Sequence, residues 1–191
     1  IFSYKDRIMY IDRILFPIET LGPGKRLVIW TRGCSKHCLN CANPELWSLL
    51  GAKNYPTDEI VKIIFNIYKE AHFDGITITG GDPLEQKEDL LSLLDSLSKL
   101  TEDILVYTGY LLAEIEELWT CFEIQKLKKN IAVLIDGRYI DEMNMPNTVL
   151  RGSSNQKLYF FKSKYEPLYH LYMKMGKKFI SVGIHNRKGD K

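Results

Sequence analysis

The sequence lacks any apolar run long enough to cross a membrane. Apolar stretches such as residues 27–30 and 131–135 are strand-sized, whereas a membrane span needs about 18 residues or more. It also lacks an excess of either charge: 26 basic and 24 acidic residues give a net charge of +2. That balance does not favour binding to nucleic acid or to an anionic membrane surface. No secretion signal is recognisable in the polar residues 1–7, and we expect a cytoplasmic protein.

Internal repeats, low-complexity tracts and clear linkers are absent as well. The 191 residues include 45% hydrophobic and 26% charged residues, which is ordinary for a globular protein with one sizeable core. Cysteine is scarce: the chain has four. Four cysteines in a chain of this length do not make a disulfide framework. We therefore predict a single domain, residues 1–191.

Three of the four cysteines nevertheless lie close together, Cys34, Cys38 and Cys41, with the spacing C-x3-C-x2-C. A cluster of thiols in a reducing compartment indicates a metal site. A structural zinc or an electron-carrying iron–sulfur cluster normally takes four protein ligands. Three thiolates leave one position at which a small molecule could bind the metal directly. The fourth cysteine, Cys121, is predicted to be a buried apolar residue.

The identity of the metal stays open at this point, since thiolates suit both zinc and iron–sulfur clusters. Zinc would need a fourth ligand, and His37 is adjacent to Cys38, which makes it a poor candidate for the same ion. His72, His170 and His185 are scattered, and no second cysteine or histidine pair follows downstream at ligand spacing. The spacing therefore favours a three-thiolate cluster site over zinc.

Strand-like and helix-like segments alternate along the chain. Helices are predicted at residues 57–72, 85–99 and 111–122, and strands at residues 27–32, 75–79, 104–108, 131–135 and 179–184. This alternation is typical of βαβ units and a parallel sheet. For residues 143–154, loop and strand both remain possible.

Polar and glycine residues follow four of these strands. Such strand ends meet at one edge of a parallel sheet, where active sites gather. In the run Gly80-Gly81-Asp82-Pro83, two glycines let the backbone approach a ligand closely, and Asp82 could accept a hydrogen bond from an ammonium group. Alone, the run would be a tight turn with Pro83 near a helix start. Beside the cysteine loop, the ligand interpretation is favoured.

The cysteine spacing followed by the strand-end Gly80-Gly81-Asp82-Pro83 run resembles the radical S-adenosylmethionine superfamily. Further motifs resemble one branch of it, the activases of anaerobic ribonucleotide reductase, a glycyl radical enzyme. These motifs are Gly22-Pro23-Gly24-Lys25-Arg26, Gly33-Cys34, Cys41-Ala42-Asn43-Pro44-Glu45-Leu46-Trp47, Thr108-Gly109-Tyr110, Asp136-Gly137-Arg138-Tyr139 and Leu150-Arg151-Gly152-Ser153-Ser154-Asn155-Gln156.

For the fold, the resemblance implies a partial, open (β/α)6-type radical S-adenosylmethionine barrel with a mostly parallel sheet. Its core would span about residues 22–156. Residues 157–191, which are aromatic and basic, would form a C-terminal extension, and packing on the core is favoured over covering a partner surface. A chain this short has little room for a closed eight-stranded barrel.

For the site, the resemblance implies that the three cysteines hold three irons of a [4Fe–4S] cluster. The fourth iron would take the amino and carboxylate groups of S-adenosylmethionine. Gly80, Gly81 and Asp82 would receive the methionine end, and the backbone around Asn40, Cys41 and Ala42 would meet the adenine. Thr108 and Asp136 are candidates for binding the ribose or the carboxylate. No catalytic acid or base is implied beyond these ligands.

For the function, the resemblance implies reductive cleavage of S-adenosylmethionine and formation of a glycyl radical on a partner enzyme, most simply anaerobic ribonucleotide reductase. A low-potential donor such as flavodoxin or ferredoxin would supply the electron; neither nucleic acid nor membrane is expected as a partner. Two residues depart from the superfamily, Asn40 where an aromatic is common and Asp82 where glutamate is common. Arg151 is either part of an anion or cofactor clamp or of a polar turn.

Two other functions remain possible from the sequence. The same chemistry could modify a small molecule or a peptide. Alternatively, the cysteines could belong to a non-catalytic zinc-binding or cluster-binding regulatory module.

Overall fold

A computed structural model of the chain describes residues 7–146 and 148–176. One sheet has the strand order β3-β1-β2-β4-β5-β6-β7. Its strands are β1 (Ile8–Ile18), β2 (Arg26–Thr31), β3 (Asn54–Pro56), β4 (Gly75–Gly80), β5 (Ile104–Tyr107), β6 (Val133–Asp136) and β7 (Lys157–Phe160). The helices are α1 (Thr57–Ala71), α2 (Lys87–Leu97), α3 (Leu112–Leu118), α4 (Cys121–Asn130) and α5 (Glu166–Lys174).

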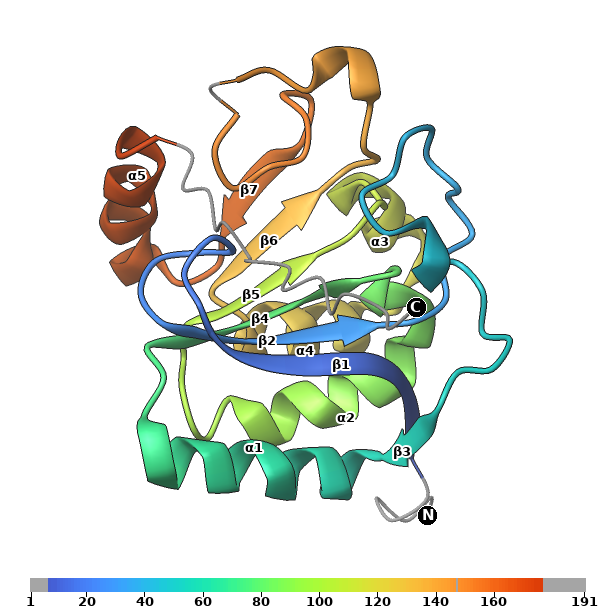
Figure 1. Cartoon of the computed structure of the whole chain (residues 1–191), viewed down its shortest axis with the longest axis vertical. Helices are drawn as coiled ribbons and strands as arrows, with labels where there is room; N and C mark the ends of the chain where they lie inside the picture. Colours follow the sequence, from blue (N-terminus) through green and yellow to red (C-terminus); the bar gives the residue numbers. More distant parts are fainter. Residues whose placement is uncertain (1–6, 147, 177–191) are drawn as a thin grey trace, which may run out of the picture.

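The centre of the sheet is parallel. β2 pairs with β4, β4 with β5, and β5 with β6, all in parallel register, and helices connect these strands along the chain (Figure 1). The α/β class and the parallel core are thus confirmed. In the described part of the chain the sheet is open, because β3 and β7 lie at its opposite ends.

Antiparallel strands, which the sequence did not predict, complete the sheet at both sides. β1 pairs with β2 and with β3, and β7 pairs with β6. Only residues 8–10 of β1 meet β3, so most of β1 forms an edge of the sheet. Pro17 lies in that edge portion, where a missing N–H group costs no ladder hydrogen bond.

Both faces of the parallel core are buried. Leu27 and Ile29 of β2 belong to the large core that includes Ile60 and Ile64 of α1. Val28 and Trp30 of β2 face the other side, where they form a smaller cluster with Leu46. Because successive strand residues point to opposite faces, burial on both sides explains the uninterrupted apolar run in the sequence.

The helix predicted at residues 111–122 is two helices, so that prediction was wrong. α3 ends at Leu118, the following residue Trp119 is extended, and Thr120 is the N-cap of α4. The Thr120 hydroxyl accepts from the Glu123 N–H at 3.3 Å, while Glu123 accepts from the Thr120 N–H at 2.8 Å. Such a capping box starts a new helix. Cys121 consequently lies in the exposed first turn of α4 and is not a buried residue as predicted.

After residue 156, the chain returns to the sheet. β7 pairs with β6, and α5 packs against the face of β5 and β6 through Tyr169 and Tyr172. The strand predicted at residues 179–184 lies outside the described residues. Residues 143–146 and 148–154, for which loop and strand both remained possible, contain no strand. No helix in residues 7–146 or 148–176 is both long and apolar enough to span a membrane.

Candidate functional site

A cavity of about 760 Å³ opens where the carboxyl ends of β2, β4, β5 and β6 meet. Residues from the loops that follow these strands line it. All the residues predicted for the site except Asp136 are among them: Cys34, Cys38, Asn40, Cys41, Ala42, Gly80, Gly81, Asp82 and Thr108. The parallel sheet therefore brings together positions that are far apart in the sequence.

The cysteine loop begins directly after β2 and is held from behind by the short helical turn Pro44–Leu46. The Gly33 N–H donates to the Leu46 carbonyl at 2.8 Å, and the Cys34 N–H donates to the Trp47 carbonyl at 3.0 Å. His37 and Asn40 have positive φ angles of 45° and 54°, which bend the loop tightly. All three cysteines of the loop are partly exposed.

The glycine turn after β4 is bonded to the start of the cysteine loop. The Gly81 N–H donates to the Thr31 carbonyl at 2.8 Å, and the Asp82 N–H donates to the Gly33 carbonyl at 2.7 Å. A Cβ atom on Gly80 would lie 2.4 Å from the Thr31 nitrogen, and one on Gly81 would lie 2.4 Å from the Gly33 oxygen. These glycines thus allow two backbones to approach, which fixes the cysteine loop beside β4.

The Asp82 carboxylate faces inward and is 1% exposed. It accepts hydrogen bonds from the Leu84 N–H at 3.1 Å, the Thr108 hydroxyl at 2.9 Å and the Gly109 N–H at 2.9 Å. Burial raises the pKa of Asp82 above its ordinary value, although these donors and Lys36 act in the opposite direction. Asp82 therefore ties the end of β4 to the end of β5.

Lys36 and Glu85 belong to the same network, and the sequence reasoning missed both. The Lys36 ammonium lies 2.9 Å from Glu85 Oε1 and 3.5 Å from Asp82 Oδ2. It also lies 3.1 Å from the centroid of the Tyr110 ring. Burial lowers the pKa of Lys36, but Tyr110 and the two carboxylates outweigh that effect and raise it. Two sequence features could have indicated this ion pair. One is a basic residue between two cysteines, and the other is an acidic residue just after the glycine turn.

Asp136 does not reach the cavity. It is 1% exposed, and its carboxylate accepts from the Leu112 N–H at 2.8 Å and from the Lys157 N–H at 3.3 Å. Asp136 thereby fixes the starts of α3 and β7, while the adjacent Gly137 lines the cavity.

The far wall of the cavity joins the loop after β6 to the loop before β7. The Gln156 side chain donates to the Gly137 carbonyl at 2.8 Å and accepts from the Gly152 N–H at 2.8 Å. Asn40 of the cysteine loop donates to Asp141 at 2.7 Å and so reaches this wall. Arg151 also lines the cavity, and its Nε has no hydrogen-bond partner among the described residues.

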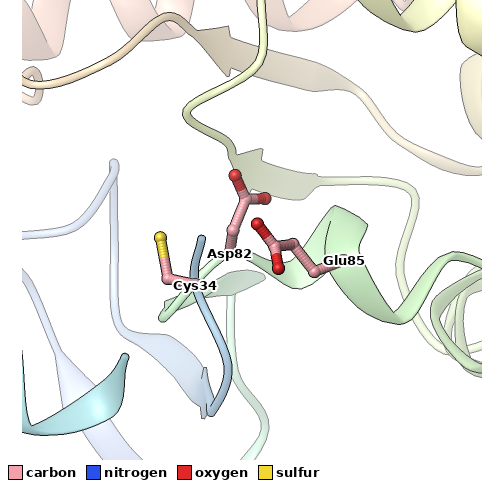
Figure 2. A group of neighbouring side chains, drawn as sticks. All are labelled: Cys34, Asp82 and Glu85. Carbon is pink, nitrogen blue, oxygen red and sulfur yellow. The ribbon is translucent and has the colours of Figure 1, made fainter. Parts of the chain in front are cut away.

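The spread of the thiols bears on which metal group fits. In the described part of the chain, one trio of potential ligands has all its donor atoms within 4.8 Å of one another: Cys34, Asp82 and Glu85 (Figure 2). The three loop cysteines are not such a trio, so at least one pair of their sulfur atoms lies further apart than this. Zinc, with Zn–S bonds of about 2.3 Å, would draw tetrahedral sulfur ligands to within about 3.8 Å. The three thiols as they lie in this structure therefore do not form a closed mononuclear zinc site.

The Cys34 thiol lies beside the acidic side chains of this trio. Burial raises the pKa of the Cys34 thiol, and the nearby charges of Asp82 and Glu85 add to that rise. The Lys36 N–H group and the Lys36 charge act in the opposite direction and lower the pKa, but they do not cancel the rise.

Comparison with known proteins adds a family to this geometry. Residues 20–159 match the model of a family described as "4Fe-4S single cluster domain". Anaerobic ribonucleoside-triphosphate reductase-activating protein of Vibrio cholerae serotype O1 is 32% identical over 76% of this chain and 95% of its own length. The proteins of that name from Enterobacteria phage T4 and Escherichia coli K12 are 32% and 29% identical. These two comparisons cover 79% and 77% of this chain, and 94% and 96% of the relatives.

Proposed function

We propose that this chain, which belongs to the 4Fe-4S single cluster domain family and to the family of anaerobic ribonucleoside-triphosphate reductase-activating proteins, is an activase that generates a glycyl radical on anaerobic ribonucleotide reductase. The observation that supports this most directly is the bonded junction between the cysteine loop and the glycine turn. That junction places Cys34, Gly81 and Asp82 at one cavity on the carboxyl edge of the parallel strands.

Cys34, Cys38 and Cys41 would hold three irons of a [4Fe–4S] cluster, which leaves the fourth iron for S-adenosylmethionine. When bound and reduced, such a cluster supplies one electron that splits S-adenosylmethionine into methionine and a 5′-deoxyadenosyl radical, the species that removes hydrogen from a glycine Cα.

The surrounding residues of the chain bind and orient the substrate. Gly80 and Gly81 offer backbone groups to the methionine end, and Asp82 keeps this turn rigid through its bonds to Thr108 and Gly109. Asn40, Cys41 and Ala42 line the part of the cavity proposed for the adenine. Thr108 remains a candidate for the ribose or carboxylate. Asp136, proposed for the same role from the resemblance, acts from outside the cavity by positioning Gly137.

The open sheet suits a protein substrate. We interpret the open sheet as a partial (β/α)6-type radical S-adenosylmethionine barrel. In this interpretation, residues 1–191 form one domain. Because β3 and β7 do not meet in residues 7–146 and 148–176, this opening is the proposed approach for a loop of a large partner. A low-potential donor such as flavodoxin or ferredoxin, in a reducing cytoplasm, would deliver the electron.

The test uses the full chain reconstituted with iron and sulfide without oxygen. Dithionite and S-adenosylmethionine should then yield 5′-deoxyadenosine and methionine, and addition of anaerobic ribonucleotide reductase should yield a glycyl radical seen by electron paramagnetic resonance. Cys34→Ser should abolish both products. Cys121→Ser is the matched control, because Cys121 is exposed and lies outside the cavity lining, and it should retain both.

Three results would contradict parts of the proposal. Absence of 5′-deoxyadenosine from iron-loaded protein excludes the chemistry. 5′-Deoxyadenosine without a glycyl radical on the reductase points to a small-molecule or peptide substrate. One zinc per chain in place of about four irons indicates a regulatory module.

A further inference from the structure

Lys36 occupies an unusual position for a lysine, in the spacer between Cys34 and Cys38. Its side chain is only 4% exposed, and its ammonium group lies between the carboxylates of Asp82 and Glu85. Lysine is rarely buried unless it is paired. The aliphatic part is confined as well, because a Cβ atom on Gly109 would lie 2.9 Å from Lys36 Cγ.

Glu85 fastens this spacer to the glycine turn. A single oxygen, Oε1, accepts from the Ser35 N–H at 2.8 Å, the Ser35 hydroxyl at 2.5 Å and the Lys36 ammonium at 2.9 Å. Glu85 lies in the short helical turn Pro83–Gln86, directly after Asp82. The loop that presents Cys34 is therefore anchored through neutral and charged hydrogen bonds to one carboxylate.

The same carboxylates form a potential metal site with Cys34. The sulfur of Cys34 and oxygens of Asp82 and Glu85 all lie within 4.8 Å of one another (Figure 2). A thiolate with two carboxylates is a ligand set that divalent transition metals bind. Among the described residues, Lys36 is the cation within ion-pair distance of both carboxylates.

We propose that Lys36 is a built-in cation that takes the place of a divalent metal between Asp82 and Glu85, and thereby reserves Cys34 for the iron–sulfur cluster. Lys36 is a positioning residue, since it acts through Cys34 and the two carboxylates. The inference rests on the proposed function in one respect, the assignment of Cys34 as a cluster ligand. Without Lys36, the buried Asp82 carboxylate and the more exposed Glu85 carboxylate beside it would lack their shared counter-charge, which makes a metal ion the favourable replacement.

The experiment compares cobalt(II) binding by the metal-free full chain and by Lys36→Met, followed by the thiolate-to-cobalt absorption band. Lys36→Met should bind cobalt roughly tenfold or more tightly than the parent chain. After anaerobic reconstitution with iron and equimolar zinc, it should hold less iron and more zinc. Lys36→Arg keeps the charge and should restore the parent behaviour in both measurements. Lys62→Met, at an exposed ion pair on α1, is the matched control and should change neither.

A second variant separates this site from other cobalt sites. Lys36→Met combined with Glu85→Gln should lose the added affinity, because one carboxylate ligand is gone. If Lys36→Met is not recovered folded, Lys36→Gln, whose side chain ends in a polar amide, replaces it. The replacement is made in the single variant and in the double variant with Glu85→Gln. Unchanged cobalt affinity and an unchanged iron-to-zinc ratio in the folded variant would overturn the proposal. Neither measurement uses S-adenosylmethionine or the reductase, so this failure is distinct from failure of the proposed activity.

Discussion

At the scale of single residues, the site depends on contacts that leave no room for a larger side chain. Gly81 adopts an ordinary φ, so its importance is steric: its Cβ position is occupied by the backbone of Gly33, the residue before Cys34. Gly80 combines the same crowding with a φ of 115°, which side chains rarely adopt. The two glycines therefore determine where the first cysteine lies.

Gly81→Ala should displace the Gly33–Cys34 backbone and reduce the iron retained after anaerobic reconstitution. Overpacking of this kind costs about 1–3 kcal/mol, and the loss should appear both in urea unfolding and in iron content. Gly51→Asn is a suitable control, because the space beside Gly51 is open and asparagine tolerates its φ of 70°. Full iron content in folded Gly81→Ala would show that the close approach is unnecessary.

At the scale of elements, the break between α3 and α4 is decided by a capping box. Thr120 and Glu123 satisfy the first N–H groups of α4, and Glu123 also pairs with Lys87 of α2 at 2.6 Å. The ion pair joins two neighbouring helices on the same side of the sheet (Figure 1). A run that has an apolar helical period is thus divided by local hydrogen bonds.

Thr120→Ala should lower the free energy of unfolding by about 1 kcal/mol, the usual cost of losing an N-cap. The pH dependence tests Glu123, whose pKa is lowered by the hydrogen bond from Lys87 and by Thr120. A depressed carboxyl pKa stabilises the fold above the ordinary glutamate value of 4.5, and the stabilisation disappears as the pH falls through the lowered pKa.

Glu123→Gln should therefore unfold more easily near neutral pH and lose less stability than the parent below about pH 4.5, as followed by urea unfolding at several pH values. The control is Glu70→Gln, an exposed position of α1 without an ion pair among the described residues. Identical acid sensitivity of the parent and Glu123→Gln would show that the capping box contributes no pH-dependent stability.

At the scale of the whole molecule, a buried polar network joins β2 to α5, elements that are far apart in the sequence. Arg26 of β2 is 0% exposed and donates to Thr77 of β4 at 2.7 Å and to Asp103 at 2.8 Å. Tyr169 of α5 donates to the same Asp103 carboxylate at 2.7 Å. The network thus connects β2, β4, the residue just before β5, and α5, which is the last helix in the described part of the chain.

Tyr169→Phe should lower the free energy of unfolding by about 1.5–3 kcal/mol, the range for a hydrogen bond to a charged group. Arg26→Met should cost more, about 3–5 kcal/mol, because it leaves Asp103 buried without its partner. Both are measured by urea unfolding. Tyr68→Phe serves as the control, since the Tyr68 hydroxyl forms no hydrogen bond within the described ranges, and a loss equal to that of Tyr169→Phe would contradict the network.

The sequence alone determined the parallel core and the main motifs of the candidate site. Runs such as residues 27–30 are apolar on both faces, which only a strand buried on both sides tolerates. The spacing of Cys34, Cys38 and Cys41 and the two glycines after β4 are local features, and they predicted a site at one sheet edge. The shared carboxyl edge follows from parallel order itself, which is why nine separate positions could be placed at one cavity.

Only the tertiary structure decided which strands complete the sheet and what several polar side chains do. The pairing of β1, β3 and β7 depends on long-range register, which their local sequences do not specify. Likewise, Asp136 lies at the end of a strand, as Asp82 lies just after one. Its carboxylate nevertheless accepts hydrogen bonds from the N–H groups of Leu112 and Lys157, outside the cavity. Lys36 and Glu85 are 49 residues apart. Charges at that separation pair only after folding has brought the cysteine loop onto the glycine turn.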